Sequence, residues 1–529
     1  MKSLFTFVIC FLLSSTIYCQ SPWLDNSFNG NGIVIDSVKN HSLSTNSMNL
    51  QSNGDLILAG ANGSLITGIT NFGITRLNSF GLIDTTFGTS GRVSISMGTG
   101  TSLAYTSALQ TDGKIVVAGT SYNGNDFDYA LVRLNIDGSL DTLFDFDGKV
   151  ITSLSVNDDL PTCIAIQPDG KIIVAGYTTD GSHTGTSMAR YLTDGSLDTT
   201  FNGTGIVLSN YLSLYEKPAS IALNQFGQII LAGGKATVGS IGEIQLLRYN
   251  SNGSIDLSFG ILGEVNTDIG TDDDAASAIV IQPDNKIVIA GSGDNFSSST
   301  SITAYDFIFA RYLPNGDLDT TFGVGGKQLI AIGNYNDFAT SIALDSNANI
   351  VSAGYSNNSS NFQDYDFALV RLTPDGNLDS SFATNGKLTT PILAADDLSY
   401  CTLIQPDGKI ISAGSTQNVG RFDLAVVRYL PSLAVGLNDF SVDNKNLLVY
   451  PNPISDRTTI NFILKENEKI SINLIDMSGK IVHQFMNSYM AKSGINQQEL
   501  IIPSSISKGN YILRLTTAEG NANVKVLIE

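Results

Sequence analysis

Short apolar runs bounded by turn residues recur along this chain, and they predict β-strands rather than helices. One copy of the pattern contains four such runs, at residues 149–152, 162–166, 171–175 and 187–191. The run from Ile172 to Ala175 is continuously apolar, so we expect this strand to be covered on both faces. Pro168-Asp169-Gly170 predicts a tight hairpin, because Gly adopts a positive φ without strain. Four short strands per unit, packed between neighbouring units, are typical of a β-propeller blade.

A constant spacing indicates that the units repeat. An Arg and a Gly lie 43 residues apart in six places: Arg76–Gly119, Arg133–Gly176, Arg190–Gly233, Arg248–Gly291, Arg311–Gly354 and Arg371–Gly414. The interval from that Gly to the next Arg varies from 14 to 20 residues. A constant segment that alternates with a variable one predicts a repeat scaffold whose loops differ on one side.

Counting the repeated residues predicts the number of blades. The Gly occurs seven times, with Gly60 as its first copy, and the Arg occurs seven times, with Arg428 as its last. Eight residues after each Arg but the last stands an Asp: Asp84, Asp141, Asp198, Asp256, Asp319 and Asp379. Three residues later stands a Phe: Phe87, Phe144, Phe201, Phe259, Phe322 and Phe382. After Arg428 the pattern stops at Pro431.

The missing seventh piece stands at the other end of the propeller sequence. Asp25 and Phe28 keep the register, since Asp25 lies 35 residues before Gly60 just as Asp84 lies 35 before Gly119. A permuted array of whole units is what a closed ring needs, because its two ends share one unit, whereas an open solenoid needs polar capping units. We therefore predict an all-β, seven-bladed β-propeller, with Asp25 and Phe28 beside Arg428. The pattern does not determine which strand begins a blade.

The repeated Arg, Asp and Phe have a structural interpretation. We expect each Phe to be a core residue, contributing roughly 1.5–3 kcal/mol if fully buried. We expect the Arg and Asp to pair, either within a blade or between blades. A catalytic pair is needed once and a structural pair in every blade, so the sevenfold recurrence favours structure over a repeated active site.

All of the variation in loop length is expected on one face, because successive strands of a blade run in opposite directions. Its longest predicted loops are Ser292–Tyr305 and Tyr355–Tyr365. Acidic residues recur there in two sets: Asp159, Glu216, Asp274, Asp337 and Asp397, and then Asp128, Glu243, Asp306, Asp366 and Asp423. One interpretation is that they cap turns and solvate the surface. The other is that two acidic rings bind Ca²⁺ or a basic or hydroxyl-rich partner; we favour the first.

The net charge of −20 disfavours nucleic acid as a partner, because phosphates need patches of Lys and Arg. Lys2 precedes an apolar run from Leu4 to Leu13, which is shorter than the roughly 20 residues that span a bilayer. We interpret residues 1–19 as a secretory signal peptide, cleaved after Cys19. A lipid-anchored Cys19 is the alternative, and bulky Tyr18 disfavours it. We expect no transmembrane segment in the remaining chain.

Cys163 and Cys401 occupy equivalent positions in distant repeats, so we expect no disulfide and a small packed side chain at each. The chain has only three His, and it shows no nucleophile elbow, phosphate loop or His-metal spacing. The residues therefore assign no catalytic, cofactor-binding or metal site. Pairs of Asp are abundant, so a glycosidase or lyase that uses Asp stays open as an alternative.

The C-terminal segment differs in composition and carries three boxes in order. They are Val449-Tyr-Pro-Asn-Pro453 with Asp456, then residues 474–482, and then residues 509–515 with a closing Lys525-Val-Leu-Ile528. This segment resembles the type A sorting domain of type IX secretion cargo in Bacteroidota. The resemblance implies a small β-sandwich that directs export across the outer membrane, with the type IX secretion machinery as its partner. It also implies release or attachment at the cell surface.

The repeats resemble the delta-60 family, whose units read Gln-Pro-Asp-Gly-Lys-Ile, Ala-Gly and Leu-Asp-x-x-Phe, and which is regarded as a β-propeller of unknown function. The hairpin element is intact at residues 168–171 and 406–409. It is degenerate at Gln225-Phe226-Gly227 and Ser346-Asn347-Ala348, where we expect hairpins that differ.

These observations predict four segments: a signal peptide (1–19), a seven-bladed propeller (24–431), a linker (432–446) and a sorting domain (447–529). We expect a secreted or surface-attached protein that binds a glycan or protein, as in adhesion, through its variable acidic face. A secreted carbohydrate-active enzyme that uses Asp is the alternative, and a purely structural surface component is a third hypothesis.

Overall fold

The computed structural model describes residues 21–209, 215–236, 242–269, 273–296, 303–357, 364–432, 447–450, 452–464, 466–476, 479–517 and 520–528. The predicted signal peptide and residues 433–446 of the predicted linker lie outside these ranges. The chain divides into two compact units, Met1–Leu433 and Ala434–Glu529. The described residues of both units form strands and turns without a helix, so none of them forms a helix that could cross a membrane.

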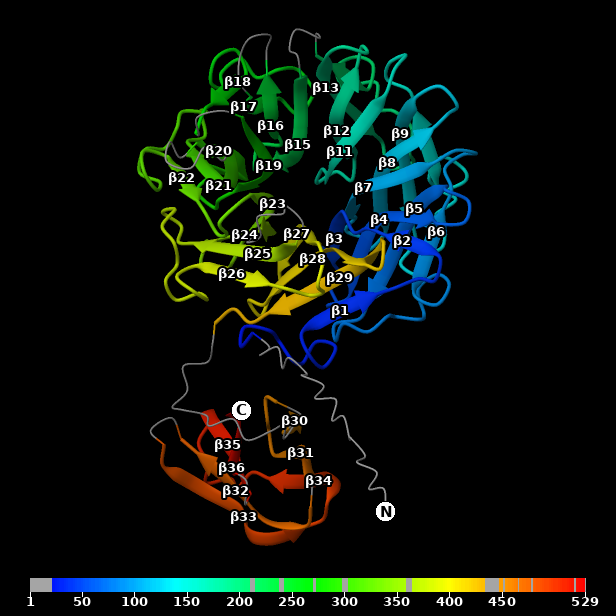
Figure 1. Ribbon diagram of the computed structural model, residues 1–529. Coiled ribbons are helices and arrows are strands. Elements are labelled where there is room, and N and C mark those ends of the chain that lie inside the picture. Colours follow the sequence, from blue (N-terminus) through cyan, green and yellow to red (C-terminus); the bar gives the residue numbers. More distant parts are fainter. Residues whose placement is uncertain are drawn as a thin grey trace, which may run out of the picture. The chain divides into compact units, whose positions relative to one another are not determined.

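The first unit is a β-propeller whose described residues form seven antiparallel sheets (Figure 1). The innermost strands are β3 (Ser47–Leu50, preceded by the short β2, His41–Leu43), β7 (Ser102–Leu109), β11 (Asp159–Ile166), β15 (Tyr215–Leu223), β19 (Asp274–Ile281), β23 (Asp337–Leu344) and β27 (Asp397–Ile404). In this order they define blades 1 to 7. Each inner strand contacts the inner strand of the next blade, and β27 contacts β3, so the ring is closed.

Three further strands complete each blade from the inside outwards. The second strands are β4 (Leu56–Ser64), β8 (Ile115–Tyr122), β12 (Ile172–Thr179), β16 (Ile229–Ala236), β20 (Ile287–Phe296), β24 (Ile350–Asn357) and β28 (Ile410–Asn418). The third strands are β5 (Thr70–Leu77), β9 (Phe127–Leu134), β13 (Thr184–Tyr191), β17 (Glu243–Tyr249), β21 (Thr303–Tyr312), β25 (Tyr365–Leu372) and β29 (Arg421–Tyr429). The outer strands are β6 (Arg92–Ile95), β10 (Lys149–Thr152), β14 (Ile206–Leu208), β18 (Glu264–Thr267), β22 (Lys327–Ile330), β26 (Lys387–Thr390) and, in blade 7, β1 (Ile33–Asp36).

The second strands are apolar because both of their faces are covered. Ile172 to Ala175 are fully buried between the neighbouring blades, as their continuous hydrophobicity predicts. The repeated Gly that follows them has a specific cause: the facing inner strand carries a β-bulge between Pro161 and Cys163. A Cβ on Gly176 would lie 2.1 Å from the Leu160 carbonyl oxygen, so only Gly fits beside the bulge.

The ring closes as the permuted pattern predicts. β1 pairs antiparallel with β29, and Figure 1 shows the two side by side although they come from opposite ends of the unit. Asp25 accepts a hydrogen bond of 2.8 Å from Nε of Arg428, and the Arg428 guanidinium lies 4.5 Å from the ring centre of Phe28. The structure also defines the blade boundaries: each blade starts with its inner strand, and blade 7 takes its outer strand from the N-terminal segment.

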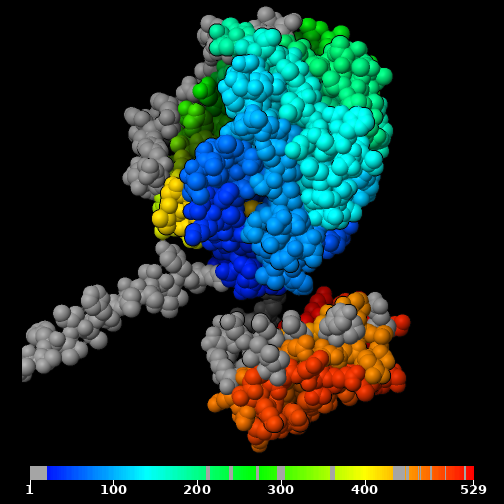
Figure 2. Space-filling view, turned by 90° about the vertical axis from the view of Figure 1, so that its right-hand side faces the viewer, coloured from blue at the N-terminus to red at the C-terminus, as the bar shows by residue number. Residues whose placement is uncertain are grey.

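The predicted loop Ser292–Tyr305 is largely a strand pair. β20 and β21 are each ten residues long, with Asp294 paired to Tyr305 and Phe296 to Thr303. The degenerate hairpins also keep the common geometry, contrary to expectation. Ala348 donates to the Asp345 carbonyl at 2.9 Å, as Gly170 donates to that of Gln167, and Ala348 adopts the same positive φ. In the space-filling view the N-terminal blades, blue to cyan, form one continuous surface (Figure 2).

The second unit is a small β-sandwich, as predicted. One sheet contains β30 (Leu448–Tyr450), β31 (Arg457–Leu464) and β34 (Gly494–Ile501). The other contains β33 (Ile481–Ala491), β32 (Glu468–Ile475), β35 (Gly509–Thr517) and β36 (Gly520–Ile528). Side chains from both sheets, among them Ile460, Leu474 and Leu513, form one apolar core.

Candidate functional site

The repeated Arg, Asp and Phe join adjacent blades and do not form an active site. In blade 5, Nε of Arg311 donates to Asp319 at 2.8 Å, and Nη1 donates to the Pro374 carbonyl of blade 6 at 2.6 Å. The guanidinium lies 4.9 Å from the ring centre of Phe322, which is fully buried. The pairs are therefore formed within each blade, and the Arg also binds the next blade. We call each Arg, Asp and Phe of this kind a blade clasp.

A Lys from the hairpin strengthens four of the clasps. Lys171 lies 3.2 Å from Asp198, which Arg190 also contacts at 2.8 Å. Burial alone would raise the pKa of Asp198, but the Thr200 hydroxyl, Lys171 and Arg190 together lower it to about 2. Such a carboxylate stays ionised near neutral pH and has its oxygens occupied, so it is suited to holding blades together.

The first set of acids on the variable face is internal. Asp159, Asp274, Asp337 and Asp397 have no exposed surface, so this set forms no acidic surface ring. Each caps the loop that enters its blade: Asp159 accepts a hydrogen bond of 2.6 Å from the Leu154 N–H, and Asp397 accepts one of 2.6 Å from Ile392. In blade 2 a Ser takes this place, and the Met97 N–H donates to Oγ of Ser102 at 3.3 Å. The turn-capping interpretation is the one that the geometry supports.

The second set of acids is also mostly buried. Asp128, Asp306 and Asp423 are at most 5% exposed, while Glu243 and Asp366 are half-buried. Asp423 accepts hydrogen bonds from the Ser37 hydroxyl at 2.7 Å and from the Asn418 amide at 2.8 Å. The predicted acidic face is therefore largely a set of caps beneath the surface. Within the described ranges, no group of three or more His, Cys, Asp or Glu side chains is placed to hold a metal ion.

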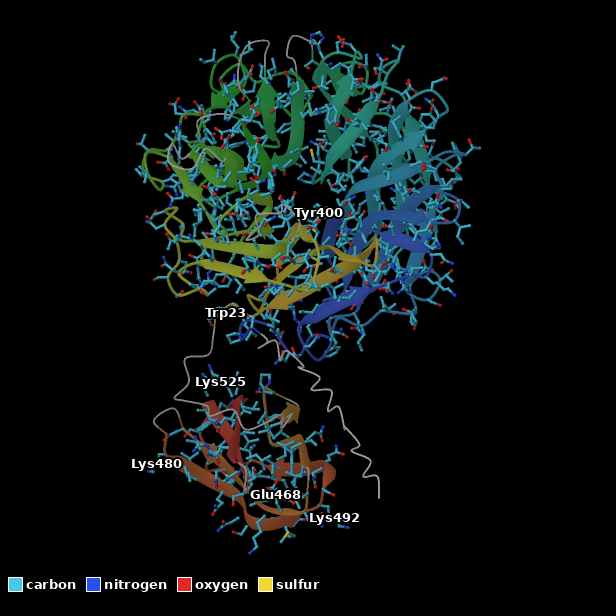
Figure 3. The ribbon with its side chains drawn as sticks, in the orientation of Figure 1. Trp23, Tyr400, Glu468, Lys480, Lys492 and Lys525 are labelled. Atoms are coloured by element: carbon cyan, nitrogen blue, oxygen red, sulfur yellow. The ribbon has the colours of Figure 1, made fainter. Side chains whose placement is uncertain are left out.

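An aromatic cluster lies on the variable face of blades 5 to 7, where none was singled out from the sequence. Phe338 on β23 stacks on Tyr305 of β21 with ring centres 5.4 Å apart and contacts Tyr355 of β24 at 5.3 Å. Tyr355 in turn meets Tyr365 of β25 edge-on at 5.2 Å and Tyr400 of β27 at 6.4 Å. All five side chains are half-buried, so they are held in place and still present surface. Figure 3 shows Tyr400 toward the centre of the ring.

The aromatic side chains continue around the same end of the inner strands through blades 2 to 4. Nζ of Lys217 on β15 lies 5.0 Å from the ring centre of Tyr177 and 5.9 Å from that of Tyr215. Burial, and then the nearby Tyr105 and Asp158, raise the pKa of Tyr177. Burial, and then Asp273 and Tyr305, raise the pKa of Tyr215, so Tyr215 lies near the cluster of blades 5 to 7. We define the aromatic belt as Tyr105, Tyr177, Tyr215, Tyr305, Phe338, Tyr355, Tyr365 and Tyr400.

Three carboxyl groups beside the belt have raised pKa values. Burial raises the pKa of Asp337 to about 6, and Asp306 adds to the shift. Burial raises the pKa of Asp397 to about 6 despite its hydrogen bonds. Burial, with Asp397 and Asp364 nearby, raises the pKa of Asp366 to about 7. Carboxyl groups that can be protonated near neutral pH beside partly exposed aromatic rings are a candidate binding or catalytic environment.

Neither cysteine belongs to this site. Cys163 and Cys401 are free thiols in the blade interior, and burial raises the pKa of each to about 12. The belt was missed in the sequence because its members stand at different positions of the repeat. Only the closed ring brings the ends of first, second and third strands from six blades together. Tyr305 and Tyr365 each stand six residues before the repeated Arg, and this recurrence is a signal that could have found part of the belt.

Comparisons with known proteins agree with the fold. The family described as a domain of unknown function (DUF5122) beta-propeller matches residues 110–144, 167–201, 227–259, 282–322, 349–382 and 405–435. The secretion system C-terminal sorting domain matches residues 448–529. No curated protein matches the chain.

Several solved structures resemble the chain at low identity. A polysaccharide lyase, Uly1, is 10% identical with a TM-score of 0.41, over 75% of this chain and 91% of that one. An ulvan lyase of family PL25 bound to -[GlcA(1-4)Rha3S]- is 12% identical with a TM-score of 0.42, over 76% and 96%. Drosophila Plexin A in complex with Semaphorin 1b is 8% identical with a TM-score of 0.39, over 75% and 86%.

The closed ring of repeated sheets, the matched repeats and the matched tail together identify the protein. The type IX sorting tail indicates export, followed by secretion or surface attachment, and the secretion machinery is its partner. The chain therefore contains DUF5122 β-propeller repeats and is a secreted repeat protein with a type IX sorting domain at its C-terminal end.

Proposed function

We propose that the propeller is an extracellular binding module that holds a glycan on the aromatic belt of its variable face. The observation that carries this proposal is the belt itself: eight partly buried aromatic side chains gathered at one end of the inner strands. A tyrosine offers a flat apolar face to the C–H face of a sugar and a hydroxyl to its polar groups. Side chains held by their neighbours also lose little entropy on binding.

The location of the protein supports the same proposal. Export by the type IX route takes the propeller to the outside of the cell, where glycans of other cells and of the surroundings are exposed. A sugar chain of several units would contact tyrosines of more than one blade. Attachment to such a surface is the adhesion role that we propose.

Binding of the mature protein to a glycan array, followed by calorimetry with soluble polysaccharides, tests the proposal. We expect Tyr400→Ala and Phe338→Ala each to weaken binding by about tenfold or more, since central aromatic side chains dominate binding energy. Phe146→Ala is the matched control, because this side chain is 93% exposed on the opposite face. Calcium and a chelator form separate arms, which test the alternative interpretation that acidic residues of the variable face bind Ca²⁺. Unchanged affinity of both belt variants would refute the proposal.

A carbohydrate-active enzyme is the second candidate, and Asp366 favours it. Asp366 is half-buried and has a pKa raised to about 7 by burial and by the nearby Asp397 and Asp364, so it could act as a proton donor near neutral pH. If this proposal holds, a bound polysaccharide is shortened over time, and Asp366→Asn stops the shortening while binding persists. Binding without shortening of any bound polysaccharide would leave the binding module as the function.

A further inference from the structure

Lys217 is the single basic residue on the seven inner strands, all of which the structure describes. It is the third residue of β15, one position after Glu216, which accepts hydrogen bonds from Thr186 of blade 3. At the equivalent position the other blades have small or apolar residues: Ser44, Leu103, Leu160, Ala275, Phe338 and Leu398. A charge at a position that is otherwise apolar or neutral indicates a local role and not a requirement of the fold.

The ammonium group of Lys217 is exposed and held by aromatic rings. It lies over the rings of Tyr177 and Tyr215, so cation–π attraction keeps it within the aromatic belt. Among the described residues no carboxylate forms an ion pair with it. The two carboxylates near the flanking tyrosines accept main-chain hydrogen bonds instead: Asp158 from Phe127 at 3.0 Å and Asp273 from Gly242 at 2.7 Å.

Several other lysines of the propeller have a carboxylate or a main-chain carbonyl group as partner. Lys114, Lys171, Lys286 and Lys409 each lie within 3.2 Å of a clasp carboxylate. Lys149 and Lys387 donate to main-chain carbonyl groups. In a chain with a net charge of −20, an exposed lysine on an inner strand without such a partner retains donors for an outside acceptor.

We propose that Lys217 forms an anion-binding subsite within the aromatic belt, so that the bound glycan carries a carboxylate or a sulfate group. The inference rests on the proposed glycan binding and names the chemistry of its ligand. The ammonium binds the anionic group while Tyr177 and Tyr215 contact the sugar on either side.

Polysaccharide pairs that differ only in charge test this subsite. Polygalacturonate carries free carboxylates, and its highly methyl-esterified form has the same backbone with most carboxylates blocked. Dextran sulfate of low substitution carries sulfate groups, and dextran has the same backbone without them. We expect the full-length mature protein to bind the charged member of at least one pair about tenfold more tightly than the neutral member, as for a charge-assisted contact. The pair that shows the difference distinguishes carboxylate from sulfate.

Variants of Lys217 separate charge from shape. Lys217→Met keeps the length of the side chain and should abolish the preference for the charged polysaccharide. Its affinity for the neutral polysaccharide should stay within about twofold of the wild-type value. Lys217→Arg keeps the charge and should retain the preference for the charged polysaccharide. Lys39→Met, at another exposed lysine, is the matched control and should bind like the wild type. Unfolding curves followed by Trp23 fluorescence check that each variant is folded.

The outcomes also separate this inference from the proposed function. Equal binding of charged and neutral members, or a preference that survives in Lys217→Met, overturns the anion subsite while glycan binding stands. A lack of binding to every glycan by the wild-type protein overturns both.

Discussion

Ala348 occupies a backbone conformation that glycine adopts in most of the other blades. Its φ is +60°, and the equivalent hairpin residues are Gly54, Gly113, Gly170, Gly227, Asn285 and Gly408, all with positive φ. A side chain in the left-handed region costs roughly 1–2 kcal/mol, which the smaller entropy of unfolded Ala offsets in part. We expect Ala348→Gly to raise the free energy of unfolding by about 1 kcal/mol. Urea denaturation followed by Trp23 fluorescence measures the change.

Gly227→Ala is the matched reverse substitution. Gly227 has a φ of +75°, and a new Cβ would meet its nearest atom at 3.8 Å, an ordinary contact. The same backbone cost should therefore lower stability by about 1 kcal/mol. Two changes of the same sign would show that φ does not control stability at this turn.

The carboxyl groups beside the aromatic belt make stability depend on pH. The pKa of Asp366 is raised to about 7, so the folded state keeps a proton that the unfolded chain releases near pH 4. The folded state therefore binds more protons between these values, and its stability falls as the pH rises from about 4 to 7. We expect Asp366→Asn to stabilise the protein at pH 7.5 and to reduce this slope, measured by urea denaturation at several pH values.

Asp198→Asn is the contrasting control at the residue scale. The pKa of Asp198 is lowered to about 2 by Thr200, Lys171 and Arg190 against the effect of burial. Its contribution to stability is present above pH 4 and is lost as the pH falls toward 2. The variant should be less stable at pH 7.5 and should approach the wild type in acid. A stabilised Asp198→Asn at neutral pH would contradict the assigned direction.

The blade clasp determines how one four-stranded sheet adheres to the next. Arg311 and Asp319 are 3% and 4% exposed, and the guanidinium binds a carboxylate, a neighbouring carbonyl and an aromatic face together. A lysine cannot make these contacts at once, because it lacks the planar fork of donors. We expect Arg311→Lys to lower the free energy of unfolding by about 2 kcal/mol. Lys39→Arg, a substitution at an exposed position, should leave the free energy of unfolding unchanged. An equal loss of stability in both variants would show that the contacts of the clasp do not explain the effect of Arg311→Lys.

Closure of the ring is a property of the whole propeller. The clasp of blade 7 joins Asp25 to Arg428, which is 403 residues away in the chain, whereas the clasp of blade 2 joins Asp141 to Arg133, eight residues away. Trp23, the single Trp of the chain, is 7% exposed and packs edge-on against Phe382 with ring centres 4.8 Å apart. Figure 3 shows it at the periphery of the ring, so its fluorescence reports docking of the N-terminal segment.

We expect Asp25→Ala and Asp141→Ala each to cost about 3 kcal/mol, since each leaves a buried Arg without its carboxylate. Only Asp25→Ala should release the N-terminal segment before the rest of the propeller unfolds. Asp25 is connected to Arg428 only through the whole propeller, whereas a short chain segment keeps residue 141 close to Arg133. Trp23 fluorescence should then change at a lower urea concentration than circular dichroism. In Asp141→Ala the two signals should coincide. Coincident signals in both variants would show that the segment does not open separately.

The repeated elements could be predicted because each depends on neighbours in the sequence. The hairpins need a positive φ at one position, the second strands need apolar residues on both faces, and the spacing of Arg, Asp and Phe recurs in every blade. The closure through Asp25 and Phe28 followed from counting these residues. The geometry of the degenerate hairpins did not, because Ala348 adopts a conformation that its residue type disfavours.

The candidate site could not be predicted in the same way. The acids of the variable face were visible as a pattern, but burial of Asp159, Asp274, Asp337 and Asp397 under their loops is a tertiary feature. Phe338 meets Tyr305 of the preceding blade, and Tyr355 meets Tyr400 of the following blade, only because the blades are arranged around one axis.

The sequence by itself determined the strands, the seven units, the shared last blade and the sorting tail, since these depend on local hydrophobic periodicity, turn residues and ordered motifs. The tertiary structure alone decided which strand begins a blade, which acids lie inside, and which aromatic side chains and lysine gather at one end of the inner strands. The physical reason is that burial and contact between blades depend on positions in space that residues far apart in the chain reach only when the ring is closed.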